Sequence, residues 1–429
     1  MAHLHLEHIG PVKAIDVELK RFNVFIGPQS SGKSTIAKLI SFCTWVEKRA
    51  VTTLTDKLFA NADDFKEQAE NYHKMHGYFN ADSRLEYQSE YIHITYNANE
   101  FSLRLLDKLS YKRKKIIYIP SDRNMVALPE LERMVVGTNT NLRSFTFDWF
   151  DARNMYDKSH RLNILDLNME YYYDKDAKLN KDKIIHTNGK TYDITLSDAS
   201  SGLQSVTPLA LLLNYYSDLY FANYGKTTSY EKELEQKMLN VRIETLYPSL
   251  DESFRNILSE DSKDQKGIYN DFLQLAYKGN NNKVILDRYK LYNQLTTPVT
   301  TDFIIEEPEQ NLFPSTQAQL INYLLTTCNK VGRRHSFTIT THSPYILTQL
   351  NILLFAGILD KQGKKEQIKD IVNPIAVIKP EEIGVFAVQT DGTAESVLNE
   401  QTGMISQNYL DSISEDLSVI FQNLYRLMF

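Results

Sequence analysis

The sequence comprises 429 residues, of which 42% are hydrophobic, and its formal net charge at pH 7 is −6. This length and apolar content suffice for a large buried core, whereas the net charge gives the whole chain no electrostatic footprint for nucleic acid. Cys43 and Cys328 are too few and too far apart for a disulfide framework or a metal cluster. No apolar run approaches membrane-spanning length and no apolar segment follows the N-terminal histidines, so we expect a cytoplasmic protein without a secretory signal.

The first motif lies between a predicted strand at residues 23–26 and a predicted helix that opens at residues 36–40. It is formed by Gly27, Pro28, Gln29, Ser30, Ser31, Gly32, Lys33, Ser34 and Thr35. This spacing is that of a phosphate-binding loop, in which the glycines let successive N–H groups converge on phosphates at a helix N-terminus. We expect Lys33 to contact the β- and γ-phosphates of a nucleoside triphosphate and Ser34 to hold Mg²⁺. The weaker alternative is a Gly/Ser-rich loop without function.

The second motif places two acidic residues directly after a short apolar strand at residues 303–305. The carboxyl ends of such strands are where open α/β sheets bind ligands. We expect Glu306 to hold Mg²⁺, directly or through water. Glu307 is expected to orient or deprotonate the attacking water, because phosphoryl transfer depends on positioning more than on covalent chemistry. The alternative is a strand that runs into an ordinary acidic loop.

A further strand is predicted over residues 337–341, and His342 follows it. Ser343 as an N-cap and Pro344 as a first-turn residue then begin the next helix. His342 would lie near the γ-phosphate as a sensor or hydrogen-bond donor, although a lone histidine is more often structural. Its position one strand after the paired glutamates favours the functional interpretation.

These motifs, in this order from Gly27 to His342, resemble the ABC-type ATPase heads of the RecF, SMC and OLD group. The forms typical of the OLD-like branch are Ile-Glu-Glu-Pro-Glu, Thr-His-Ser-Pro, Ala-Ser-Ser-Gly-Leu-Gln at residues 199–204 and Tyr-Ile-Pro-Ser-Asp-Arg at residues 118–123. The resemblance implies an α/β P-loop NTPase fold of ABC type, with a mixed sheet core, an antiparallel β subdomain and helical insertions. It also implies ATP and Mg²⁺ as cofactors.

By that resemblance, Ser200 and Gly202 would contact the γ-phosphate of ATP bound to a second subunit. We call residues 199–204 the signature. Ser201 replaces the usual second glycine of this motif, so either Ser200 or Ser201 could be the serine that contacts the phosphate. From the residues alone, the Ser-Ser-Gly run is an ordinary helix start that Asp198 or Ser200 caps. Two roles are open for Arg123: it contacts a phosphate or the adenine, or it is an ordinary arginine in a salt bridge.

The chain is expected to form a single ATPase head over residues 1–429. Its core segments are predicted at 1–45, 113–214 and 301–429, with helical insertions at about 46–112 and 215–300. A hairpin is predicted over residues 185–196, turning at Asn188-Gly189. The basic cluster at residues 112–115 is predicted to be a solvated turn, with a DNA-facing patch as the alternative.

No Asp-x-Asp pair follows His342, and the pair at Asp174 and Asp176 lies in a predicted solvated turn, so we expect no TOPRIM nuclease domain in this chain. Stand-alone ATPases of the branch resemble those encoded beside a separate effector in prokaryotic anti-phage systems. The leading hypothesis is an ATP-hydrolysing homodimer or higher oligomer, assembled through ATP, that controls a separate effector, a nuclease. The alternatives are a RecF-like repair ATPase that binds DNA and a non-catalytic nucleotide-gated scaffold, which Glu306 and Glu307 disfavour. No membrane partner is expected.

Overall fold

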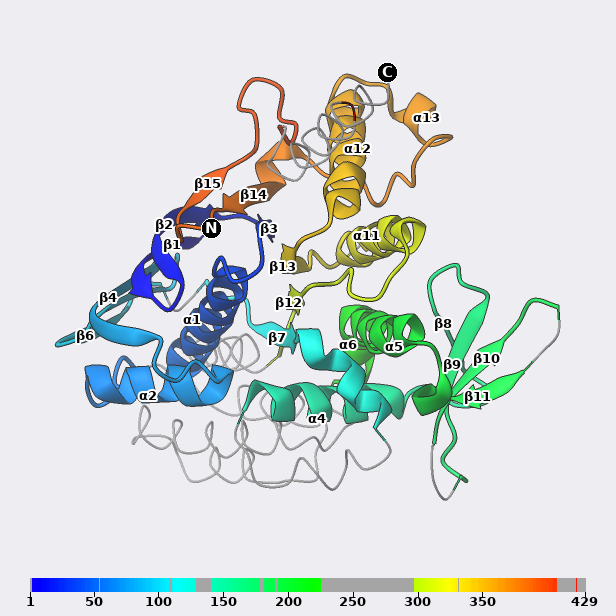
Figure 1. Cartoon of the computed structure of the whole chain (residues 1–429), viewed down its shortest axis with the longest axis horizontal. Helices are drawn as coiled ribbons and strands as arrows, with labels where there is room; N and C mark the ends of the chain where they lie inside the picture. Colours follow the sequence, from blue (N-terminus) through cyan, green and yellow to red (C-terminus); the bar gives the residue numbers. More distant parts are fainter. Residues whose placement is uncertain are drawn as a thin grey trace, which may run out of the picture.

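The structure is a computed structural model that describes residues 2–406, apart from 54, 108–109, 129–139, 178–180, 190–191, 225–296 and 331, together with residue 422. The strands among these residues form three sheets (Figure 1). A six-stranded core sheet has the strand order β15-β14-β3-β13-β12-β7. Its strands are β3 (Phe22–Ile26), β7 (Lys114–Ile119), β12 (Thr300–Glu306), β13 (Ser336–Thr341), β14 (Ile383–Val388) and β15 (Ala394–Ser396).

The register of the core sheet brings the ends of its central strands to one edge. All pairs from β14 to β7 are parallel, and only β15 is antiparallel. Thr341 pairs with Ile26, and Glu306 pairs with Thr340. Because these residues end β13, β3 and β12, the loops that follow the three strands leave the sheet side by side.

Alternating apolar residues on the core strands bury the two faces of the sheet against different elements. Phe303 and Ile305 join the cluster that contains α4 (Asn141–Arg153), α5 (Ser201–Asn214), α11 (Pro314–Cys328) and α12 (Pro344–Lys361). Ile304 joins the cluster formed with α1 (Lys33–Thr53). Figure 1 shows α1 and α5 on opposite sides of β7 and β12.

The second sheet is antiparallel and lies over α1, with the order β2-β1-β4-β5-β6. Its strands are β1 (Ala2–Ile9), β2 (Val12–Leu19), β4 (Phe79–Gln88), β5 (Ile92–Asn97) and β6 (Phe101–Leu105). The helical insertion expected at about 46–112 is therefore wrong. That region holds the end of α1 and the helix α2 (Ala62–His73), but it also holds three strands of the antiparallel sheet. β4 pairs with β1, β5 with β4 and β6 with β5, because alternating side chains such as Ile92, Ile94 and Tyr96 bury one face.

A third, small antiparallel sheet has the order β11-β10-β9-β8. It contains β8 (Leu162–Asn163), β9 (Met169–Tyr173), β10 (Asp182–His186) and β11 (Asp193–Thr195). The pairing of β10 with β11 confirms the predicted hairpin, and Gly189 in its turn has a positive φ of 79°. Together the three sheets confirm the predicted α/β fold with a mixed sheet core and an antiparallel β subdomain.

The basic cluster at residues 112–115 is not the solvated turn that its charge suggested. The side chains of Arg113 and Lys115 are buried, at 4% and 5% exposure. Lys115 Nζ lies 3.0 Å from Asp148 Oδ1, and Arg113 donates to the Tyr224 hydroxyl at 3.1 Å. Because both cations face partners inside the protein, these two residues do not form the DNA-facing patch that was the alternative.

Two expected segments lie outside the described residues. They are most of the insertion at 215–300 and the helix expected near the C-terminal end of the chain. Within the described ranges, no helix is both long enough and apolar enough to cross a membrane.

Candidate functional site

The phosphate-loop motif follows β3 directly and leads into α1, which begins at Lys33. Two residues of the loop adopt positive φ angles, Ser30 at 61° and Gly32 at 108°. Gly27 has no room for a side chain, because a Cβ there would lie 2.2 Å from the carbonyl oxygen of Val388 on β14. The glycines thus meet a backbone requirement of the tight turn between strand and helix.

Lys33 lies inside this loop, with only 4% of its surface exposed. Its Nζ donates to the carbonyl oxygen of Pro28 at 2.7 Å. Burial lowers the pKa of Lys33 to about 8, although the carboxylates of Glu307 and Glu309 act to raise it. Ser31 Oγ is buried and has no hydrogen-bond partner among the described residues. A buried cation and an unsatisfied hydroxyl beside a helix N-terminus fit the oxygens of a bound phosphate.

Glu306 ends β12 and is buried. One carboxylate oxygen accepts a hydrogen bond from the Tyr118 hydroxyl, and the other accepts from the backbone N–H of Ser121 at 3.4 Å. Burial and the neighbouring Glu306 carboxylate raise the pKa of Tyr118 well above its ordinary value, so the phenol remains a donor at neutral pH. The Glu306 carboxylate is therefore held in one orientation. No role in the site was expected for Tyr118, although it begins the motif at residues 118–123.

Glu307 turns away from the strand with a positive φ of 43°. Its backbone N–H donates to the Thr340 carbonyl oxygen at 3.0 Å, and its Oε1 lies 3.3 Å from Nε2 of His342. The hydrogen bond from His342, aided by the charges of Lys33 and Arg123, lowers the pKa of Glu307. Its side chain is 34% exposed. Glu307 is thus an ionised acceptor that solvent can reach.

Glu309 is a third acidic residue of the site, one that the sequence reasoning did not assign. Its Oε1 accepts from the His342 backbone N–H at 2.6 Å and from Thr341 Oγ1 at 2.9 Å. Burial raises the pKa of Glu309. The sequence signal was present, because Glu309 is the last acid of the Ile-Glu-Glu-Pro-Glu motif. It fastens the end of β13 to the loop after β12.

The helix that follows His342 starts as predicted. Ser343 Oγ accepts hydrogen bonds from the backbone N–H groups of Tyr345 and Ile346, at 3.1 and 3.3 Å, and Pro344 is the first residue of α12. This cap fixes the turn that leaves His342 beside Glu307.

The Ser-Ser-Gly run lies at the start of α5, which packs on the face of the core sheet opposite to α1. Ser200 is the N-cap, and its Oγ accepts from the Leu203 N–H at 3.4 Å, as the helix-start interpretation predicted. Ser200 and Ser201 are exposed. A Cβ at Gly202 would lie 2.9 Å from the carbonyl oxygen of Asn311. The run therefore packs on the loop after the acidic residues while its two serines face solvent.

Arg123 occupies a place that neither alternative described. The residue is fully buried, at 0% exposure. Its guanidinium donates to backbone carbonyl oxygens, so it is neither positioned as a phosphate or adenine contact nor paired with a carboxylate side chain. The acceptors are Ser205 at 3.0 Å, Glu306 at 2.9 Å, Glu307 at 2.9 Å, Pro308 at 3.3 Å and Pro120 at 3.4 Å.

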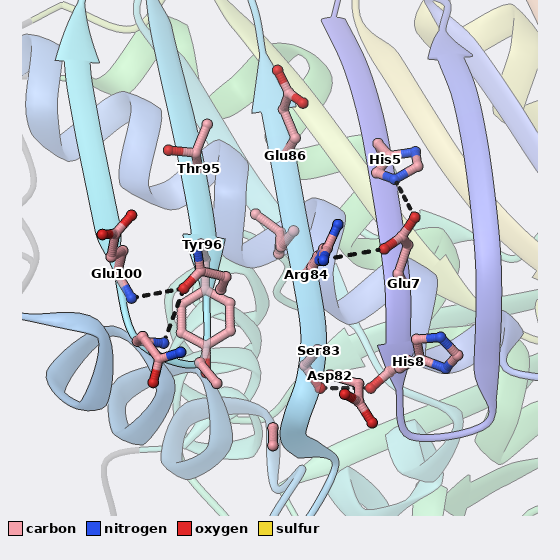
Figure 2. A pocket seen from close by; sticks show the side chains of 15 residues that line it. His5, Glu7, His8, Asp82, Ser83, Arg84, Glu86, Thr95, Tyr96 and Glu100 are labelled. Carbon is pink, nitrogen blue, oxygen red and sulfur yellow. Dashed lines mark hydrogen bonds and ion pairs between the residues drawn. The ribbon is translucent and has the colours of Figure 1, made fainter.

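A groove of about 790 Å³ lies elsewhere, on the antiparallel sheet. Figure 2 shows His5 and Arg84 directed toward Glu7, with atoms 3.3 and 3.6 Å apart. Its lining comes from β1, β4, β5 and the turn that follows β5, and it includes no residue of the phosphate loop. Among the described residues, no group of three or more histidines, cysteines or acids is arranged to hold a metal ion. The candidate site is thus the sheet edge and not this groove.

No family model and no curated protein matches the chain. Solved structures give distant likenesses. An SMC head bound to the C-terminal winged-helix domain of ScpA is 10% identical, covers 94% of this chain and 99% of its own, and has a TM-score of 0.40. The SMC head domain from Thermotoga maritima is 11% identical over 81% and 90%, with a TM-score of 0.32. The recombination mediator RecF is 11% identical over 92% and 97%, with a TM-score of 0.28. Likenesses this distant carry no argument about function, which must rest on this chain's own residues.

Proposed function

We propose that this chain binds and hydrolyses ATP in a Mg²⁺-dependent reaction, as an ABC-type ATPase that dimerises around the nucleotide. The observation that carries the proposal is the meeting of the phosphate loop, the paired glutamates and His342 at one edge of a parallel sheet. Strand ends of this kind supply the ligand sites of open α/β sheets.

The roles of the residues follow from their surroundings. Lys33 would neutralise the phosphates, with Ser31 donating to one of their oxygens. Ser34 and Glu306 would hold Mg²⁺, which would supply positive charge that polarises the phosphate groups. Glu307, ionised and accessible, would orient the attacking water, and His342 would hold the Glu307 carboxylate and sense the γ-phosphate.

The dimer is part of the proposal because each chain carries two half-sites on different faces. The phosphate loop leads into α1 on one face of the core sheet, and Ser200 to Gly202 begin α5 on the other. A second copy would supply its exposed Ser200, together with Gly202, to the ATP bound here. A two-fold axis would then give two equivalent ATP sites in one isologous interface.

We further propose that the dimer regulates a separate effector, a nuclease, in prokaryotic anti-phage defence. The support is the resemblance of the four motifs to the OLD-like branch. Burial of Arg113 and Lys115 weighs against the RecF-like alternative of direct DNA binding, because buried cations cannot contact phosphates of DNA. The ionised Glu307 weighs against a non-catalytic scaffold.

Phosphate release from ATP tests the proposed activity. Lys33→Ala should weaken ATP binding by about 2 kcal/mol or more, because it removes a charge-assisted contact from a buried site. Lys38→Ala, further along the same helix, is the matched control and should bind ATP like the wild type. Equal ATP affinities for wild type and Lys33→Ala in calorimetry would refute the phosphate-loop assignment.

The effector proposal is tested by adding the product of a neighbouring nuclease gene and asking whether ATP changes its cleavage rate.

A further inference from the structure

The guanidinium of Arg123 connects two segments that belong to different half-sites. Nη1 and Nη2 donate to the carbonyl oxygens of Glu306 and Glu307, both at 2.9 Å. Nε of the same planar group donates to the carbonyl oxygen of Ser205 in the second turn of α5, at 3.0 Å. One rigid group therefore holds the loop that carries the catalytic glutamate and the helix that carries the signature.

A second contact joins the same two segments. Gly202, in the first turn of α5, lies so close to Asn311 that a Cβ would approach its carbonyl oxygen to 2.9 Å. Asn311 itself has a positive φ of 61°. The first turn of α5 and the loop after β12 thus approach each other closely, and buried Arg123 donates hydrogen bonds to both segments.

Burying this cation carries a free-energy cost that its surroundings offset. Removal from water lowers the pKa of Arg123 to about 10, while the carboxylates of Glu309, Glu307 and Glu306 act to raise it. The guanidinium stays charged at neutral pH, and each of its bonds is charge-assisted. Because carbonyl oxygens are the acceptors, substitution of the side chains around it would leave the connection in place.

We propose that Arg123 is a positioning residue that fixes the signature helix relative to the catalytic loop, so that each subunit presents both half-sites at the spacing an ATP dimer requires. The proposal rests on the ATP-bridged dimer proposed above. In a two-fold dimer, Glu307 of one chain serves one ATP and Ser200 of the same chain serves the other. Their separation within a chain must match the separation of the two nucleotides. Movement of the Glu307 loop at one ATP would also reach α5 at the other.

The test uses Arg123→Lys in a Glu307→Gln background, which should hold the ATP dimer. Lysine keeps the charge but lacks the planar fork, so one ammonium cannot serve Ser205, Glu306 and Glu307 together. ATP binding to the single chain should stay within about twofold of the parent. The dissociation constant of the ATP-bound dimer, measured by sedimentation, should rise at least about tenfold, as expected for the loss of a charged hydrogen bond.

Arg153→Lys is the matched control, because Arg153 is another buried arginine and it pairs with Asp182 at 3.3 Å, away from the sheet edge. It should leave the dimer unchanged. A dimer equally tight with Arg123→Lys, or equally weakened by Arg153→Lys, would overturn the inference. If Glu307→Gln alone formed no dimer with ATP, the proposed function would fail instead.

A measurement on the unchanged arginine covers the case in which Arg123→Lys does not fold. Ser200→Arg should prevent dimerisation while leaving the phosphate loop intact. ATP binding to this monomer should change the hydrogen exchange of the amides in the first two turns of α5, because Arg123 connects them to the Glu307 loop. Exchange at α5 that ignores ATP would overturn the inference.

Discussion

Glu307→Gln is the substitution that isolates the chemical step from nucleotide binding. Glutamine has the same length, the same backbone strain at φ 43° and an oxygen that can still accept from His342 Nε2, now 3.3 Å from the carboxylate. What it removes is the negative charge, which the lowered pKa of Glu307 keeps in place at neutral pH. The contacts of Lys33 and Glu306 are unaffected, so ATP binding should be retained.

If Glu307 orients the attacking water as proposed, loss of its carboxylate should slow hydrolysis by at least about 10²-fold, the scale of general-base catalysis. That factor corresponds to about 2.7 kcal/mol in the activation barrier. Single-turnover phosphate release measures the rate, and calorimetry measures the ATP affinity, which should change by less than about twofold. Glu381→Gln makes the same chemical change at an exposed carboxylate paired with Lys361 and should be silent. Wild-type turnover by Glu307→Gln would show that the two glutamates have been assigned the wrong roles.

Three further outcomes are expected. Because the pKa of Lys33 is lowered to about 8 and ATP favours its charged form, binding takes up a proton above pH 8. ATP affinity should then fall about tenfold between pH 7 and pH 9 in calorimetry, and Lys33→Ala should lose that slope. Tyr118→Phe removes the hydroxyl that orients Glu306, so the Mg²⁺ concentration for half-maximal hydrolysis should rise about tenfold, whereas Tyr111→Phe should leave it unchanged. An unshifted Mg²⁺ titration would count against the Tyr118 role. Glu309→Ala leaves the His342 N–H and the Thr341 hydroxyl without their acceptor, so unfolding should become easier by about 1–3 kcal/mol in urea titrations. A urea midpoint equal to that of the wild type would show that the hydrogen bonds of Glu309 do not stabilise the fold.

The central fold could be predicted because its strands carry local signals. Uninterrupted apolar runs such as residues 303–305, each ending at a polar motif, mark buried parallel strands. The antiparallel sheet was missed where the information is not local. The apolar residues of β4, β5 and β6 alternate with polar ones, and these strands join the sheet through the pairing of β4 with β1 at the N-terminal end of the chain. Because the charged helix α2 precedes these strands, the whole of residues 46–112 was predicted to be a helical insertion.

The site could be predicted in its motifs but not in the connections between them. Spacing alone pointed to Lys33, Glu306, Glu307 and His342 as candidates, because each belongs to a motif that follows a recognisable strand. The role of Arg123 depends on backbone carbonyl oxygens from three separate segments, and acceptors of that kind leave no trace in residue types. Lys115 likewise looked solvated because Asp148, its buried partner, is distant in sequence.

Light scattering with and without ATP tests the central claim, that ATP joins two copies of this chain through complementary half-sites. Glu307→Gln should have the mass of one chain without nucleotide and of two chains with ATP. Adding Ser200→Arg places charge and bulk where the partner's γ-phosphate would lie, and it should keep the protein monomeric with ATP while ATP binding persists. A mass that responds neither to ATP nor to Ser200→Arg would reduce the Ser-Ser-Gly run to a helix cap and contradict the account.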